Sequence, residues 1–308
     1  MPSGKSTVIK KILKLKKEKN ALVLAHLYQD LDVQHVADFC GDSFELAKKA
    51  KSADQKNIVF CGVTFMAESA KILNPEKHVF IPRKDAGCRM ADMITKDDVV
   101  KLKEKYPSAA VVCYINSSAE TKSVCDMCVT SSNALKIIKN MKEKEIIFVP
   151  DKNLGAYIAK QLPDKVFHFF DGCCPVHDNI TLFELEKAKE LHPGALVLVH
   201  PECRPEINES ADFVGSTSAI INFVKDSDKK SFIIGTERAI VEKLTEECPD
   251  KEIYPIADHV VCVNMKMTTL EDLLWTLEDL DDEVTLSDEL MVSARTCLDN
   301  MLKAGSAK

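Results

Sequence analysis

The feature that most constrains the fold of this chain is a set of polar residues repeated every 86 to 88 positions. Three apolar, strand-like runs each end in two polar side chains that are two residues apart. These pairs are His26 and Tyr28, Tyr114 and Asn116, and His200 and Glu202. A fixed period of this kind indicates structural repeats, and repeats of this length are large enough to be small domains.

Two further features share the period. A hydroxyl residue follows each polar pair near a predicted helix start, and a cysteine follows the last strand-like run of each repeat. The hydroxyl residues are Ser43, Ser131 and Thr217, and the cysteines are Cys88, Cys174 and Cys262. If the repeats surround a pseudo-threefold axis, each presents one thiol, one polar pair and one helix N-terminus to a common centre. Ligands of α/β sheets collect beyond the carboxyl ends of the strands, where these residues lie.

Short apolar runs alternate with amphipathic helical patterns such as residues 44–51, 135–142 and 182–191. The strand-like runs cover residues 21–25, 57–61, 78–81, 109–113, 146–149, 166–170, 195–199, 232–234 and 253–256. Strand–helix–strand alternation predicts parallel sheets with right-handed crossovers. The predicted fold class is α/β, with three similar three-layer α/β/α domains around a central active site. Each domain is expected to have a small parallel sheet of three strands.

The expected domain boundaries follow the period. The three repeat domains cover residues 1–92, 93–179 and 180–266. Residues 267–308 form a tail of two helices that packs back across the domains. The acidic segment 278–283 is expected to separate these two helices.

Composition excludes several classes of function. A net charge of −7 argues against non-specific binding to nucleic acid. No apolar run approaches the roughly 18 residues of a membrane span, so no membrane partner is expected. The basic segment 10–17 lacks the apolar core and cleavage site of a signal peptide, and is expected to be a surface helix. The expected location is the cytoplasm.

Twelve cysteines are many for a cytoplasmic chain. Because disulfides are disfavoured there, the thiols are expected to be buried or to bind metal. Core packing is the preferred interpretation of Cys61, Cys113 and Cys203, which lie in or at the end of apolar strand patterns. Cys125 and Cys128 form a Cys-x-x-Cys pair. This pair is either a redox switch of the loop before Ser131 or, as we favour, a reduced structural pair.

Three converging thiolates from different domains do not match a structural zinc site, which takes four ligands from short local motifs. An iron–sulfur cluster suits them better, because three cysteines on a cubane leave one iron open as a Lewis acid. The hydroxyl residues at helix N-termini suit phosphate or carboxylate. The candidate acid–base groups are His26, Tyr28, Tyr114, His200 and Glu202. Together these residues predict a small, oxygen-rich, anionic substrate.

The chain also resembles the quinolinate synthase family, nearly from end to end. The matching segments are 25–28, 41–43, 61–68, 86–91, 114–116, 130–134, 150–155, 172–177, 200–203, 215–217, 235–237 and 262–266. Each motif is moderately specific, whereas the set in this order and spacing is highly specific. The resemblance implies a three-domain enzyme of NAD biosynthesis with a [4Fe–4S] cluster on three cysteines. The implied reaction condenses iminoaspartate with dihydroxyacetone phosphate to quinolinate, phosphate and water. Functional coupling to an aspartate-oxidising enzyme is expected.

The resemblance further implies a role for each site residue. The cluster ligands are Cys88, Cys174 and Cys262. Cys174 is preferred to its neighbour Cys173 because it matches a family pattern together with Gly172 and His177. The substrate-binding residues are His26, Ser43 at the phosphate end, Tyr114, Asn116, Ser131, His200, Glu202 and Thr217. The residues expected to transfer protons are His26, Tyr28, Tyr114 and Glu202. His177 is expected to contact the substrate or to support a residue that does.

Two other functions remain compatible with parts of the sequence. One is a non-catalytic iron–sulfur redox sensor or carrier, which an open iron and a polar cavity do not suit. The other is a three-domain anion-binding protein with ordinary buried cysteines. A brown protein with about four irons per chain would exclude the anion-binding protein. Cluster-dependent quinolinate formation would then exclude the carrier.

Overall fold

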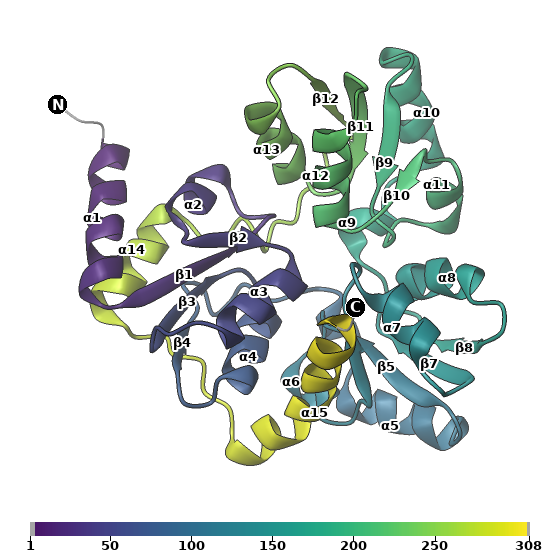
Figure 1. The fold of residues 1–308 in the computed structure, drawn as a ribbon, viewed down its shortest axis with the longest axis horizontal. Helices are drawn as coiled ribbons and strands as arrows, with labels where there is room; N and C mark the ends of the chain where they lie inside the picture. Colours follow the sequence, from purple (N-terminus) through teal and green to yellow (C-terminus); the bar gives the residue numbers. More distant parts are fainter. Residues whose placement is uncertain (1–3, 307–308) are drawn as a thin grey trace.

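The computed structural model describes residues 4–306 and shows three α/β lobes around a common centre (Figure 1). Within these residues each lobe has one parallel sheet of four strands. The strand orders are β2-β1-β3-β4, β6-β5-β7-β8 and β10-β9-β11-β12, so the three sheets share one topology. The predicted α/β class with three small parallel sheets is confirmed, whereas the residue boundaries of the domains stay a prediction.

In the first lobe the sheet is covered on both faces. One face of β1 places Leu22 and Leu24 against α3 and α4, and the other places Val23 and Ala25 against α1 and α14. The strands are β1 (Ala21–His26), β2 (Phe39–Gly41), β3 (Asn57–Cys61) and β4 (His78–Phe80). The helices are α1 (Gly4–Glu18), α2 (Leu31–Val36), α3 (Ser43–Lys51) and α4 (Thr64–Leu73), followed by the 3₁₀ turn η1 (Ala91–Met93).

The second and third lobes repeat this arrangement. The strands of the second are β5 (Ala110–Tyr114), β6 (Met127–Val129), β7 (Glu145–Val149) and β8 (Val166–Phe169). Its helices are α5 (Lys96–Lys105), α6 (Ala119–Lys122), α7 (Ala134–Asn140), α8 (Lys152–Gln161) and α9 (Pro175–Asp178). The strands of the third are β9 (Leu196–Val199), β10 (Phe213–Val214), β11 (Ser231–Gly235) and β12 (Glu252–Pro255). Its helices are α10 (Leu182–Leu191), α11 (Pro205–Glu209), α12 (Thr217–Asp226) and α13 (Ala239–Glu247).

The expectation of three strands in each sheet was wrong. The additional strands β2, β6 and β10 have only two or three residues, too few to produce a periodic pattern in the sequence. An aspartate lies directly before each short strand. Its carboxylate accepts a backbone N–H of the neighbouring strand at 2.8 Å and so fixes the short strand to it. The pairs are Asp38 with Val23, Asp126 with Val111, and Asp212 with Val197. These aspartates keep the same spacing of 88 and 86 residues.

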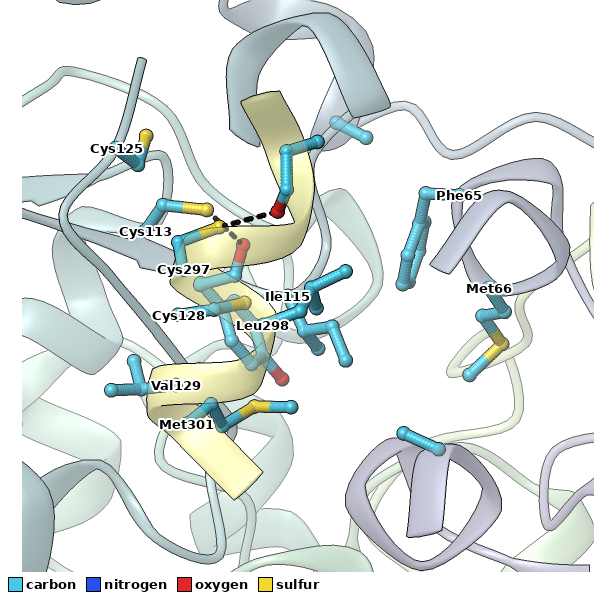
Figure 2. Packing of buried hydrophobic residues seen from close by; sticks show 14 of the residues in the cluster. Phe65, Met66, Cys113, Ile115, Cys125, Cys128, Val129, Cys297, Leu298 and Met301 are labelled. Atoms are coloured by element: carbon cyan, nitrogen blue, oxygen red, sulfur yellow. Dashed lines mark hydrogen bonds between the residues drawn. The ribbon is translucent and has the colours of Figure 1, made fainter. Parts of the chain in front are cut away.

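The chain ends in two helices, α14 (Leu270–Asp279) and α15 (Asp288–Ser306), separated by a turn in which Leu280 has a φ of 52°. Helix α14 packs against α1 and β3 of the first lobe. Helix α15 contacts α4 of the first lobe and α6, β6 and α7 of the second. Figure 2 shows Leu298 and Met301 of α15 among core residues that include Ile115, Val129 and Phe65. Within residues 4–306, no helix combines the length and apolarity of a bilayer span.

Replacing Leu298 with alanine is expected to lower the free energy of unfolding by about 2–5 kcal/mol, because Leu298 is 0% exposed in this core. Val292, on the same helix, is 72% exposed, and its replacement with alanine should change stability by less than about 0.5 kcal/mol. Urea unfolding of both variants checks this. Equal effects of the two substitutions would show that the side chain of Leu298 is not buried between α15 and the lobes.

Cys297 of α15 lies together with three other thiols, Cys113, Cys125 and Cys128 (Figure 2). All four are free and buried. Cys113 and Cys128 are register partners on β5 and β6. The Sγ of Cys297 donates to the carbonyl of Lys122 at 3.4 Å. Neither alternative for Cys125 and Cys128 is tested by these contacts, so the favoured reduced structural pair and the redox switch both stay predictions. Cys61, Cys113 and Cys203 are buried in the core, as expected.

Candidate functional site

A cavity of about 220 Å³ lies between the three lobes. Its wall is formed largely by residues that follow the carboxyl ends of strands, which is where α/β folds place their ligands. The predicted site residues all line it: His26, Tyr28, Ser43, Cys88, Tyr114, Asn116, Ser131, Cys174, His177, His200, Glu202, Thr217 and Cys262. The repeats therefore bring residues from all three lobes to one place.

The hydroxyl residues reach the cavity because of the three short strands. Strand β2 ends directly before the Asp42-Ser43 start of α3, β6 ends two residues before Ser131, and β10 ends three residues before Thr217. Ser43 and Thr217 are the first residues of α3 and α12. The backbone N–H groups of these first turns, together with the hydroxyls, suit an anion. The buried Oδ1 of Asn116, another cavity residue, has no hydrogen-bond partner in the described structure.

Two histidines in the wall are held as neutral hydrogen-bond donors. The N–H of Tyr28 donates to Nδ1 of His26 at 3.1 Å, and the N–H of Glu202 donates to Nδ1 of His200 at 3.3 Å. An Nδ1 that accepts a hydrogen bond leaves the proton on Nε2. Burial is the main cause that lowers the pKa of each histidine from 6.5 to about 3. Both rings therefore carry their proton on Nε2 and can donate from it. The Nε2 atom of His200 lies 3.3 Å from the Oγ of Ser131.

The low pKa of His26 predicts a loss of stability in mild acid. The pKa of His26 is about 3 in the folded chain and 6.5 in the unfolded chain. Between these two pH values, His26 is protonated in the unfolded chain and neutral in the folded chain. The stability contributed by neutral His26 is complete above about pH 6.5 and is lost progressively as the pH falls towards 3, by about 1.4 kcal/mol per unit.

This pH effect can be isolated with His26→Gln, because every other titrating group is present in both proteins. Urea unfolding between pH 7 and pH 5 should show a steeper loss of stability in the parent than in the variant, by about 1.4 kcal/mol per unit below the ordinary histidine pKa. The same pH dependence in both proteins would show that His26 titrates normally in the folded state.

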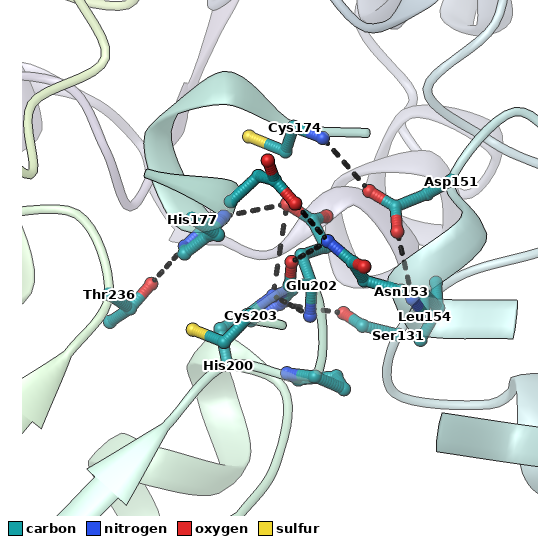
Figure 3. Close-up of polar contacts among 12 residues, drawn as sticks. Ser131, Asp151, Asn153, Leu154, Cys174, His177, His200, Glu202, Cys203 and Thr236 are labelled. Carbon is teal, nitrogen blue, oxygen red and sulfur yellow. Dashed lines mark hydrogen bonds and ion pairs between the residues drawn. The ribbon is translucent and has the colours of Figure 1, made fainter. Parts of the chain in front are cut away.

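Glu202 is a buried carboxylate shared by two lobes. Its Oε1 accepts from the Oη of Tyr114 at 2.6 Å, and its Oε2 lies 2.7 Å from Nδ1 of His177 (Figure 3). Burial alone would raise the pKa of Glu202, but His200, His177 and the hydrogen bonds from His177 and Tyr114 lower it below its ordinary value. Glu202 is therefore ionised and accepts from both partners.

The hydrogen bonds continue from His177 to the first lobe. Nε2 of His177 lies 2.9 Å from the Oγ1 of Thr236, which lies 2.9 Å from the Oη of Tyr28. The Oη of Tyr28 is also 3.0 Å from the Oγ1 of Thr217. When neutral His177 donates from Nδ1 to the ionised Glu202, its Nε2 accepts from Thr236, and Tyr28 donates to Thr236. Each hydrogen bond of this chain then points in the same direction, from Tyr28 through Thr236 and His177 to Glu202. His177 thus supports Glu202 and Tyr28, whereas its expected role towards a substrate stays a prediction.

Each of the three cysteines begins a helical turn. The N–H four residues later donates to the cysteine carbonyl, from Asp92 to Cys88 at 2.9 Å, from Asp178 to Cys174 at 2.8 Å and from Lys266 to Cys262 at 3.3 Å. Burial raises the pKa of Cys88 to about 12 and also raises those of Cys174 and Cys262, whereas backbone N–H groups of each turn oppose this rise. N–H groups directed at sulfur are a feature of thiolate ligands to metal clusters.

The described structure does not bring these three thiols as close together as a single metal ion would require. One zinc ion with Zn–S bonds of about 2.3 Å would hold three sulfurs roughly 3.8 Å apart. Among residues 4–306 the group whose ligand atoms lie within 4.8 Å of one another is Cys174, His177 and Glu202, and not the three cysteines. That group could bind a metal, but both nitrogens of His177 are already engaged. A cubane binds its ligands on separate iron atoms, so it does not require the three sulfurs to lie within 4.8 Å of one another.

Three residues of this region were missed by sequence reasoning, namely Asp151, Thr236 and Glu237. Thr236 joins His177 to Tyr28, and the two acids accept the backbone N–H groups of Cys174 and Cys262. A signal for the acids was present, because Asp151 and Glu237 are 86 residues apart, as Ser131 and Thr217 are. No such signal exists for Thr236, whose neighbours come from other lobes.

Comparison with known proteins gives a match over almost the whole chain. The model of the family described as Quinolinate synthetase A protein matches residues 10–303. A quinolinate synthase of Clostridium perfringens (strain SM101) is 52% identical over 295 residues, which are 96% of this chain and 98% of that protein. The quinolinate synthase of Clostridioides difficile (strain 630) is 51% identical over 292 residues, 95% and 96% of the two chains. That of Caldicellulosiruptor bescii is 51% identical over 294 residues, 96% and 97%.

Proposed function

Because the chain belongs to the quinolinate synthetase A family of enzymes, we propose that it acts as a quinolinate synthase in NAD biosynthesis. Its substrates would be iminoaspartate and dihydroxyacetone phosphate, and its products quinolinate, phosphate and water. The observation that carries this proposal is the convergence of three cysteine turns, two neutral histidines and three hydroxyl residues on one cavity. A redox carrier needs no such set of anion-binding groups, and a simple anion-binding protein needs no converging thiols.

We propose that Cys88, Cys174 and Cys262 hold a [4Fe–4S] cluster. With three thiolate ligands the cluster would keep one iron open, and when bound it would supply a Lewis acid for a substrate oxygen. Two observations support this assignment over a single metal ion: the three sulfurs do not all lie within 4.8 Å of one another, and backbone N–H groups are directed at each sulfur.

The remaining residues divide between binding and proton transfer. The first turn of α3 with Ser43 would bind the phosphate of dihydroxyacetone phosphate. Nε2–H of His200, the hydroxyl of Ser131 and the amide of Asn116 would bind carboxylate groups of iminoaspartate. His26 and Thr217 lie on the wall formed by the first and third lobes and would complete the anion site.

Glu202 is placed to accept and return protons. It is ionised and buried, so a proton removed from the substrate can pass to it directly or through the hydroxyl of Tyr114. The chain from Tyr28 through Thr236 and His177 would supply a second route to the same carboxylate. Proton transfers of this kind contribute roughly 10²–10⁴-fold each. Condensation to an aromatic ring with loss of two waters needs several of them.

The proposal is tested by anaerobic purification followed by an assay of quinolinate. Iminoaspartate is unstable in water, so it would be generated in the assay by an aspartate-oxidising enzyme, the expected functional partner in the cytoplasm. The expected result is a brown protein with about four irons per chain and quinolinate formation that is lost after treatment with an iron chelator. A loaded protein that forms no quinolinate would favour a redox carrier, and a colourless one would favour an anion-binding protein.

A further inference from the structure

In two of the three cysteine turns, a buried carboxylate accepts the backbone N–H of the cysteine. The N–H of Cys174 donates to Oδ2 of Asp151 at 3.1 Å, and the N–H of Cys262 donates to Oε1 of Glu237 at 3.3 Å. Both acids are 0% exposed. Figure 3 shows Asp151 between the backbone of Cys174 and the start of α8. Each hydrogen bond acts on the backbone of a proposed cluster ligand and not on its sulfur.

Each carboxylate uses its second oxygen to hold the start of a helix. Oδ1 of Asp151 accepts from the N–H of Leu154 in α8 at 2.8 Å. Oε2 of Glu237 accepts from the N–H of Ala239 in α13 at 2.7 Å. One side chain therefore joins a rigid element of the lobe to the cysteine turn, and rotation of that turn would break the link.

The first lobe builds the same turn without a carboxylate. The shared backbone hydrogen bonds run from Thr64 to Ala86 at 2.9 Å, from Lys152 to Gly172 at 2.8 Å and from Arg238 to Val260 at 2.9 Å. The residue before each donor is Val63, Asp151 or Glu237. Val63 has no side-chain cap. Because a valine suffices for the turn, the fold itself does not require an acid at this position.

Burying a carboxylate costs free energy unless it is fully hydrogen-bonded. Because the turn forms without an acid in the first lobe, the acids of the other two lobes are expected to have a role other than building the turn. We propose that Asp151 and Glu237 are positioning residues that orient the cluster ligands Cys174 and Cys262. This inference rests on the proposed [4Fe–4S] site. Outer partners that orient metal ligands change metal affinity roughly 10- to 100-fold when they are replaced. Each acid also holds the N–H of the cysteine itself, which is then not available to the cluster sulfurs, and hydrogen bonds to those sulfurs are one of the factors that set the reduction potential.

The test compares Asp151→Asn and Glu237→Gln with a matched control. In each variant one carboxylate oxygen becomes an NH₂ donor, so the side chain can accept only one of the two backbone N–H groups, and the link between the helix start and the cysteine turn is broken. Asp126→Asn is the control, because Asp126 also holds a backbone N–H, that of Val111, at the far end of β5. In anaerobically loaded protein, iron release to a chelator should be roughly 10- to 100-fold faster in the two test variants. Their cluster potential, followed by spectroelectrochemistry, should shift to more positive values. Asp126→Asn should match the parent in both.

The measurements distinguish a wrong cluster assignment from a wrong positioning role for the two acids. A parent protein that takes up no iron overturns the cluster assignment. A loaded parent together with Asp151→Asn and Glu237→Gln proteins of unchanged iron release and potential overturns the positioning role alone. Asp151→Glu keeps the carboxylate, as Glu237 does in the third lobe, and should restore the parent potential. If Asp151→Asn does not fold, as judged by circular dichroism, the result for Glu237→Gln decides.

Discussion

Replacing Glu202 with glutamine is expected to reduce turnover by roughly 10²–10⁴-fold while the protein still binds its cluster. Glutamine has nearly the same shape: its oxygen can accept from Nδ1 of His177, and its NH₂ group then donates to the hydroxyl oxygen of Tyr114, which reverses that one hydrogen bond. What is lost is the negative charge, and with it the ability to take a proton from the substrate. Steady-state assays of quinolinate, with iron content and visible absorption measured in parallel, check this expectation.

Glu68→Gln is the matched control for this prediction. Glu68 is also a largely buried carboxylate, and it accepts the N–H of Ala119 at 2.9 Å, but it does not line the cavity. Turnover of Glu68→Gln should stay close to that of the parent. Full activity of Glu202→Gln would remove Glu202 from the proton path, and loss of iron in that variant would instead give it a part in holding the cluster.

The period of 86 to 88 residues was enough to predict which residues share the cavity. His26 and Tyr114 are the last residues of β1 and β5, and His200 directly follows β9, because equivalent strands of a repeat end at equivalent places. The three cysteines were found in the same way. The strand count was wrong because β2, β6 and β10 are held by single aspartates, which a search for apolar periodicity does not detect.

The connections between lobes could not be predicted from the sequence. Thr236 contacts Tyr28 and His177, which are 208 and 59 residues away in the chain. Such contacts depend on how the lobes pack, and no local pattern records that packing. The protonated nitrogen of His26 and of His200 is likewise set by a backbone N–H two residues later, which becomes visible only when the turn is seen in three dimensions.

The largest effect on iron binding is expected from the cysteines. Replacing Cys88, Cys174 or Cys262 singly with serine should reduce bound iron to a small fraction of the parent value and abolish quinolinate formation, because two thiolates cannot retain a cubane that normally takes four. Iron and sulfide analysis after anaerobic purification, together with the assay of quinolinate, checks all three positions.

Cys173→Ser provides the control, since Cys173 is adjacent to Cys174 but does not line the cavity. The two neighbours differ in their backbone contacts, because it is Cys174 that begins α9 and whose N–H is held by Asp151. We therefore expect Cys173→Ser to keep its iron and its activity. Loss of iron in Cys173→Ser with retention in Cys174→Ser would reverse the ligand assignment and place the cluster outside the turn that Asp151 holds. Retention in all four variants would mean that the thiols do not bind iron, and the enzyme would then have to act on its anionic substrates through His200, Glu202 and the helix N-termini alone.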